Sequence, residues 1–295
     1  MIDNFYIRRL ESSDISTIRD WARNEGFCPG IEDILVYKNT DNKGIWVGCL
    51  NDLPIGCIAG IRYNSSYGFI GLFIVLKEFR GNGYGVKLWK HALKYLEKIP
   101  IIGLEAAINR LDDYKKWGFK LSSKTTRWKF DFSNNFLVDK LYPEINNDFA
   151  VVHSRNVPSE QIQIYDAKRE SNSRPHFLSD WLNNKNGNLS VLVDKNSSCH
   201  GFGLIRPCLL RNGKGWRIGP ILADTPPLAE LLIRDLLLNH DGTVFLDSPG
   251  LNPYSKFLLE KLGFTEDSYT FRMYKGEYTN ISLNQVYGLA CLELG

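Results

Sequence analysis

The sequence has no hydrophobic run long enough to cross a membrane and no apolar N-terminal segment of the kind that directs secretion. Its formal net charge is only +3, and lysines and arginines form no long cluster, which argues against a nucleic-acid partner. The six cysteines include no Cys-x-x-Cys pair, so neither a zinc site nor a disulfide framework is expected. These absences predict a cytoplasmic protein with free thiols and without a metal or membrane partner.

The length and composition predict two compact domains. A chain of 295 residues exceeds one typical domain, and two domains of about 150 residues are a reasonable expectation. The fractions of hydrophobic residues (43%) and charged residues (23%) are ordinary for a soluble globular protein.

The most informative stretch runs from residue 69 to residue 96. Residues 69–75 are apolar, β-branched and aromatic, which predicts a buried strand. Residues 84–96 carry apolar side chains at helical spacing, which predicts an amphipathic helix. A tight turn must therefore join the strand to the start of the helix.

Glycines at positions 81, 83 and 85 fill this turn. Glycine permits positive φ and close backbone approach, so successive N–H groups can converge on one point. That point lies at a helix N-terminus, where free amides and the helix dipole favour an anion. The turn therefore predicts a pyrophosphate cradle, with a simple strand–turn–helix bend as the alternative.

The spacing excludes two other phosphate-binding loops. A P-loop continues with Lys and Ser or Thr, whereas Val86 follows Gly85 here, and a dinucleotide fold requires Gly-x-Gly-x-x-Gly. The pattern Arg80-x-x-Gly83-x-Gly85 instead resembles the acetyl-CoA loop of the GNAT superfamily of N-acetyltransferases.

The predicted order of elements supports this resemblance in both halves of the chain. In the first half we predict strands over residues 5–10, 45–50, 54–62, 69–75 and 101–107, helices over 15–23, 31–37, 84–96 and 111–117, and a final pair of strands reaching residue 132. After a connection over residues 133–147 the order repeats, with helices over 157–170, 177–183, 227–238 and 254–262 and strands over 189–193, 201–209, 216–223, 244–247 and from 264 onward. The run 286–295 is strand-like and is expected to extend a sheet edge.

This order predicts an α/β (mixed α+β) protein with two tandem GNAT-like domains, each a twisted mixed sheet flanked by helices. We place a GNAT acetyltransferase domain at residues 1–140 and a divergent GNAT-like domain at 148–295. The whole chain resembles one branch of tandem GNAT proteins through residues 21–30, 68–75, 216–224, 271–276 and 292–295. That resemblance implies acetyl-CoA as co-substrate and an amine as acceptor.

The second half lacks the features that carry the chemistry. In place of the glycine turn, Pro226 and Pro227 remove two N–H donors and Asp224 adds a negative charge. In the first half Tyr114 matches the GNAT pattern Tyr-x-x-x-Gly-Phe, whereas the equivalent residue in the second half is Leu259. We therefore predict catalysis in the first half only.

The resemblance also implies the residues of the cofactor site. Pantetheine would pair with the strand before the turn at Phe73, Ile74 and Val75, where backbone N–H groups can polarise the thioester carbonyl. The pyrophosphate would lie on the turn and the first helical residues, namely Arg80, Gly81, Asn82, Gly83, Tyr84, Gly85 and Val86.

Tyr114 is the predicted general acid, which protonates the departing thiolate; the alternative is an aromatic residue packed beside Trp117. The general base is less obvious, because the strand that often carries a glutamate in this superfamily has Gly71 and Leu72 instead. Glu105 on the next strand is the best carboxylate, with a water relay or an ordinary strand-end carboxylate as alternatives.

Glu25 and Asp33 lie on the helices that usually cover the acceptor in this superfamily, so they are the predicted amine-binding residues. We thus predict an acetyl-CoA-dependent N-acetyltransferase in which a primary amine of a small molecule or protein attacks directly in a ternary complex. The tandem halves form a pseudo-dimer, so a monomer is expected. The alternatives are a non-catalytic acyl-CoA-binding or protein-interaction module, and transfer of a longer acyl group or to a hydroxyl.

Overall fold

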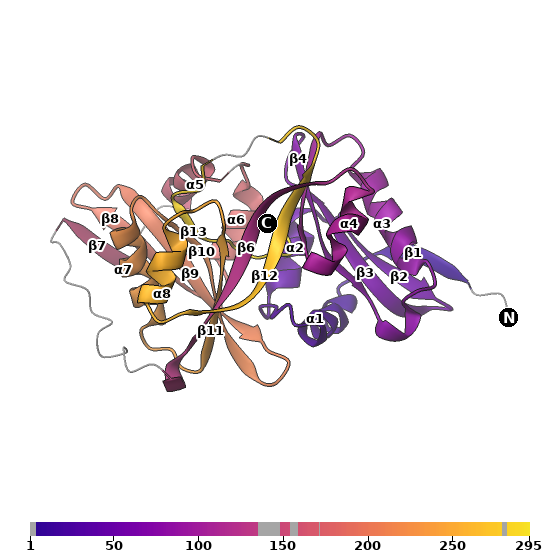
Figure 1. Cartoon of the computed structure of the whole chain (residues 1–295), viewed down its shortest axis with the longest axis horizontal. Helices are drawn as coiled ribbons and strands as arrows, with labels where there is room; N and C mark the ends of the chain where they lie inside the picture. The colour runs from indigo at the N-terminus through magenta and orange to yellow at the C-terminus, as the bar shows by residue number, and fades with distance from the viewer. Residues whose placement is uncertain (1–3, 135–147, 154–158, 171, 279–281) are drawn as a thin grey trace.

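The computed structural model describes residues 4–134, 148–153, 159–170, 172–278 and 282–295. Within these ranges the strands form one 13-stranded mixed sheet in the order β1-β2-β3-β4-β5-β12-β6-β11-β10-β9-β8-β7, with β13 paired to β10 (Figure 1). The strands are β1 (Phe5–Arg9), β2 (Ile45–Leu50), β3 (Leu53–Arg62), β4 (Tyr67–Val75), β5 (Ile101–Ala106), β6 (Lys120–Asp131), β7 (Phe149–His153), β8 (Asn188–Asp194), β9 (Cys199–Leu209), β10 (Lys214–Ala223), β11 (Thr243–Pro249), β12 (Thr265–Lys275) and β13 (Val286–Gly288).

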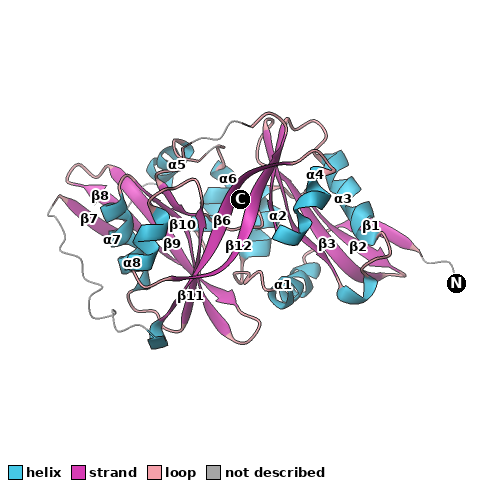
Figure 2. Ribbon diagram, in the orientation of Figure 1, coloured by secondary structure: helices cyan, strands magenta, loops and turns pink. Residues whose placement is uncertain are grey.

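Helices cover both faces of this sheet (Figure 2). They are α1 (Asp14–Glu25), α2 (Asp33–Thr40), α3 (Tyr84–Tyr95), α4 (Leu111–Lys115), α5 (Ser159–Ala167), α6 (Pro175–Leu182), α7 (Pro226–Leu237) and α8 (Ser255–Lys261). The predicted mixed α/β class is therefore confirmed. None of the helices in the described ranges has the length and apolar character that a bilayer crossing requires.

The two halves exchange strands at the centre of the sheet. β12, from the second half, pairs on one side with β5 and on the other with β6, both from the first half. β6 in turn pairs with β11 of the second half. Figure 1 shows β6 and β12 running side by side through the middle of the molecule, between the two groups of helices.

This exchange corrects one predicted element. We expected two strands between residues 118 and 132, but residues 120–131 form the single strand β6. The segment contains no glycine or proline that would make a turn, so it continues as one strand, and β12 takes the place expected for the second. The sheet consequently does not divide between the halves. The predicted domain boundary at residues 140–148 and the predicted connection over residues 133–147 fall largely outside the described residues, and both stay predictions.

Two further elements differ from expectation. β7 was not predicted and pairs antiparallel with β8 at the far edge of the sheet. The C-terminal run forms a strand only over β13, which pairs with β10; residues 289–295 then cross toward the first half.

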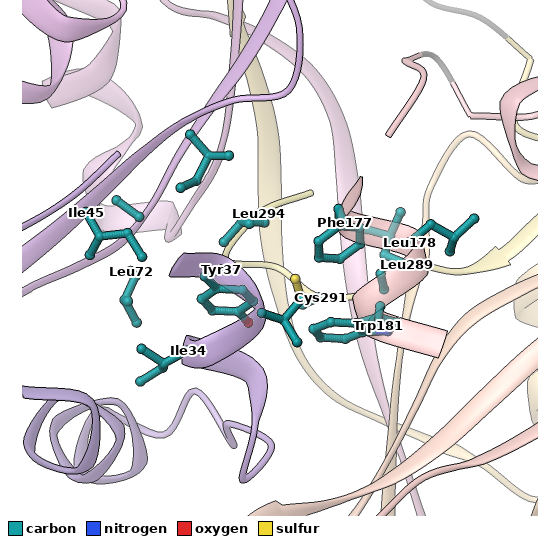
Figure 3. Packing of buried hydrophobic residues seen from close by; sticks show 14 of the residues in the cluster. Ile34, Tyr37, Ile45, Leu72, Phe177, Leu178, Trp181, Leu289, Cys291 and Leu294 are labelled. Atoms are coloured by element: carbon teal, nitrogen blue, oxygen red, sulfur yellow. The ribbon is translucent and has the colours of Figure 1, made fainter. Parts of the chain in front are cut away.

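A shared hydrophobic core joins the two halves on one face of the sheet. Tyr37 of α2 and Trp181 of α6 stack with ring centroids 6.3 Å apart, and Cys291 of the C-terminal run lies beside both (Figure 3). Leu72 of β4 and Phe177 of α6 belong to the same buried cluster. Because apolar area from both halves leaves water together, this core stabilises their association.

Buried ion pairs cross the same boundary. Asp247 on β11 accepts two hydrogen bonds from Arg127 on β6, at 2.7 and 3.0 Å, and another from Arg217 on β10. Arg206 on β9 makes a two-point ion pair with Asp33 on α2, at 2.8 and 2.9 Å. All these side chains are buried, so each charge depends on its partner for compensation.

Asp247→Asn should lower the free energy of unfolding by about 3–5 kcal/mol, because it removes the buried negative charge that Arg127 and Arg217 share. Burial alone would raise the pKa of Asp247, but Arg127 and Arg217 outweigh it and lower this pKa from 3.8 to about 2. The stabilisation is therefore fully present above pH 3.8 and is lost as the pH falls toward 2. Denaturant unfolding of both proteins between pH 2 and 7 measures this difference.

Asp267→Asn is the matched control, since Asp267 is exposed on β12. It should unfold like the wild type. A difference below about 1 kcal/mol between Asp247→Asn and wild type at pH 7 would contradict the assigned role of this ion pair.

Candidate active site

The candidate active site is a cleft of about 900 Å³ where β4 and β5 separate. The two strands pair in parallel only from Tyr67 with Ile101 to Ile70 with Leu104. Beyond Ile70, β4 contains a bulge: two of its residues, Leu72 and Phe73, face one residue of β3, and Leu72 adopts a φ of +46°. The bulge turns β4 away from β5, and the space between them forms the cleft.

The glycine turn lies at the open end of this cleft and contributes Gly81, Gly83 and Gly85 to its lining. Gly81 and Gly83 have φ values of +85° and +80°, which explains the need for glycine. A Cβ atom added to either would have no atom within 4 Å, so the turn faces open space. α3 begins at Tyr84, so the free N–H groups of its first turn lie next to this glycine turn, where the helix dipole favours an anion.

Arg80 and Asn82 brace the turn. Arg80 donates through Nε to the Val75 carbonyl and through Nη2 to Glu25 at the end of α1, both at 2.7 Å. The Asn82 amide contacts the carbonyl oxygens of Phe79 and Arg80, both at 3.4 Å. Of the remaining predicted cofactor residues, Phe73, Val75 and Val86 line the cleft. Ile74 points into the shared core, and Tyr84 stacks on Phe5.

Tyr114 on α4 lines the cleft on the same side as α3. Its ring packs against Trp89 of α3, with centroids 5.1 Å apart, and Trp89 in turn packs against Phe73. Burial raises the pKa of the Tyr114 phenol above its usual value, so it carries its proton at neutral pH. Tyr114 is packed among aromatic rings and also lines the cleft, and its role as general acid stays a prediction.

Glu105 lines the cleft but is held by three donors. Its carboxylate accepts hydrogen bonds from Thr125 of β6 at 3.0 Å, and from Thr270 and Arg272 of β12, both at 2.7 Å. These contacts tie β5 to β12, its neighbour in the exchanged sheet, and to β6 on the far side of β12. The predicted role of Glu105 as general base stays a prediction, and a carboxylate with its oxygens so occupied is poorly placed to receive a proton.

The two predicted amine-binding residues differ in position. Glu25 lines the cleft, where it pairs with Arg80. Asp33 does not: its side chain is fully buried, and both of its oxygens are bound by Arg206, with the Gly30 N–H as a further donor. The prediction that Asp33 contacts the acceptor is therefore corrected. It is a structural partner of the second half.

Among the described residues of the second half, β13 lies between the two strands that correspond to β4 and β5. β10 pairs in parallel with β11 only from Trp216 to Ile218, and beyond that point β13 pairs with β10 at Ile221 and Leu222. β13 thus occupies the gap that remains open in the first half. Pro226 and Pro227 form the first turn of α7, and the side chain of Asp224 accepts hydrogen bonds from Tyr165 and Arg169.

The second half nevertheless builds part of the first cleft. Ser268, Tyr269 and Thr270 of β12 line it, as do Leu292 and Glu293 of the C-terminal run. Arg217 also donates to the Phe27 carbonyl at 3.2 Å and so fixes the loop after α1, whose residue Phe27 lines the cleft. These residues were not predicted from the sequence, because the exchange of β12, the course of the C-terminal run and the contact of Arg217 with the loop after α1 arise only in the folded protein. Among the described residues no cluster of His, Cys, Asp or Glu side chains is arranged to hold a metal ion.

Comparisons with known proteins agree with this architecture. A model of the acetyltransferase (GNAT) family matches residues 14–119, and a model of an acetyltransferase (GNAT) domain matches residues 162–288. The chain therefore belongs to the GNAT superfamily and carries two GNAT domains in tandem.

Individual proteins resemble this chain over nearly all of its length. A holothin acyltransferase from a Pseudoalteromonas species is 27% identical over 280 residues, which covers 94% of this chain and 90% of that protein. The crystal structure of a proposed acetyltransferase from Pyrococcus horikoshii superimposes with a TM-score of 0.80 at 21% identity, covering 99% and 96% of the two chains. A tandem GNAT protein from the clavulanic acid biosynthesis pathway gives a TM-score of 0.69 at 12% identity, covering 94% and 100%. The two structures establish the likeness of fold alone.

Gly83→Asp should abolish binding of acetyl-CoA, because the new carboxylate would stand in the open space at the turn and repel the pyrophosphate. Isothermal titration calorimetry measures the dissociation constant. Gly242→Asp is the matched control, since Gly242 has a similar φ of +77° and equally open surroundings and does not line the cleft. Equal affinity of the two variants would refute the assignment of the turn.

Proposed function

We propose that the protein is an acetyl-CoA-dependent N-acetyltransferase acting on a primary amine, with one active site in the first half. The observation that carries this proposal is the continuity of one cleft, which joins the glycine turn at the start of α3, the separated strands β4 and β5, and Tyr114. In the second half β13 fills the gap between β10 and β11, which argues against a second such site. A monomer in the cytoplasm, without a nucleic-acid partner, belongs to the same proposal.

In this proposal the turn binds the pyrophosphate and the separated part of β4 binds the pantetheine. Backbone N–H groups near Phe73 polarise the thioester carbonyl as the amine nitrogen attacks it directly in the ternary complex. The C–N bond forms, the C–S bond breaks, and Tyr114 gives its proton to the departing thiolate. The attacking nitrogen releases one proton to solvent, directly or through a base, and the Tyr114 phenolate regains one from solvent. Its raised pKa keeps that proton in place until the thiolate develops.

Transfer of a longer acyl group is one alternative to this proposal. The relative from Pseudoalteromonas is an acyltransferase by name and acts on holothin, which favours a small-molecule acceptor here as well. A non-catalytic acyl-CoA-binding module is the alternative from another class. Measuring acyl transfer from different acyl-CoA donors to amines distinguishes an acetyltransferase, an enzyme for longer acyl groups and a non-catalytic module.

Wild-type protein incubated with acetyl-CoA and a panel of amines should release free CoA. A thiol reagent measures this release, and the same assay compares acetyl-CoA with longer acyl-CoA donors. Tyr114→Phe should lower kcat about 100-fold, because the phenylalanine cannot donate a proton. Its affinity for acetyl-CoA should stay within about twofold of wild type, since the ring packing is retained.

Tyr254→Phe is the control, because Tyr254 is partly exposed in the second half and does not line the cleft. It should leave turnover unchanged. Binding of acetyl-CoA without turnover of any amine by the wild type would favour the module, and equal rates of Tyr114→Phe and wild type would remove Tyr114 from the mechanism.

A further inference from the structure

The cleft has four carboxylates among its lining residues, and they differ in how they are engaged. Glu105 is held by three donors, and Asp113 lies at the exposed rim, paired with Arg110. Glu25 is paired with Arg80, which itself bonds to the Val75 carbonyl, so Glu25 lies toward the glycine turn. The fourth carboxylate is Glu293, and it lies at the opposite, closed end of the cleft.

The C-terminal run brings Glu293 to the point where β4 and β5 part. Gly71 is the first residue of β4 beyond the last pair with β5, and it faces the backbone of Glu293. A Cβ atom on Gly71 would lie only 1.8 Å from the Glu293 carbonyl oxygen. The missing side chain at position 71 therefore makes room for a residue supplied by the other half.

The Glu293 side chain is held in place at one oxygen. Its Oε2 accepts a hydrogen bond from the Tyr37 hydroxyl at 3.3 Å and lies 3.7 Å from Nη1 of Arg217. Neither Tyr37 nor Arg217 lines the cleft, so both support the carboxylate from behind. No described residue donates a hydrogen bond to its Oε1.

We propose that Glu293 is the general base of the acyl transfer, delivered to the first active site by the C-terminal run of the second half. This proposal rests on the proposed function. Glu293 binds the acceptor amine at the closed end of the cleft and takes a proton from its nitrogen as the C–N bond to the thioester carbonyl forms. Tyr114 protonates the sulfur as the C–S bond breaks, and both residues then exchange protons with solvent.

The test compares Glu293→Gln, Glu293→Ala and Glu25→Gln with wild type. Glu293→Gln keeps the size of the side chain and an acceptor for Tyr37 but cannot take up a proton. We expect kcat/KM for the amine to fall about 100-fold or more, with the affinity for acetyl-CoA within about twofold of wild type. In Glu293→Ala, added formate should restore part of the lost rate, because it can replace the carboxylate in the space left beside the cleft.

Rescue by formate distinguishes a proton acceptor from a packing residue, since formate does not rebuild packing. Glu260→Gln, on the exposed face of α8, should behave as wild type. Melting temperatures show whether each variant is folded, and Glu293→Asp, which keeps the acid, should retain more activity than Glu293→Gln even where both are destabilised.

Wild-type rates for Glu293→Gln, a loss of rate without formate rescue in Glu293→Ala, or a larger loss in Glu25→Gln would each overturn the proposal. A wild-type protein that never acylates an amine would instead be a failure of the proposed function. The two failures are thus separable.

Discussion

Charges buried between the two halves must compensate one another, and much of the architecture depends on this constraint. Asp247 balances Arg127 and Arg217, and Asp33 balances Arg206, with side-chain contacts of 3 Å or less in the two-point pairs. A buried ion pair adds little net stability compared with apolar packing, but it penalises any arrangement in which a charge loses its partner. These pairs therefore fix how the halves meet, and with it the walls of the cleft.

The second half has become part of the first active site. Its own gap between β10 and β11 is filled by β13, and the chain that leaves β13 runs to the closed end of the first cleft. β12 lies beside β5 and supplies Thr270 and Arg272 to Glu105. The second domain thus forms part of the wall of the cleft in the first half and supports the residues around it.

Short sequence patterns predicted the features that depend on residues close together in the chain. The glycine turn, the helix after it and Tyr114 follow from spacing within one stretch, and the structure places all of them on one cleft. The exchange of β12 could not be predicted, because a strand that pairs with β5 and a strand that pairs within the second half have the same residue pattern in the sequence. Asp33 was misplaced for the same reason: its charge was visible in the sequence, but its partner Arg206 lies far along the chain.

The position of β12 also has a consequence for synthesis of the chain. β5 lies between β4 and β12 in the sheet. It ends at Ala106, whereas β12 begins only at Thr265. While a ribosome makes the protein, this edge of β5 stays unpaired until β12 (Thr265–Lys275) has emerged. Such distant pairing slows folding, and during the delay the exposed edge is available to other nascent chains. Chaperones that shield this edge would therefore act on the unfinished first half.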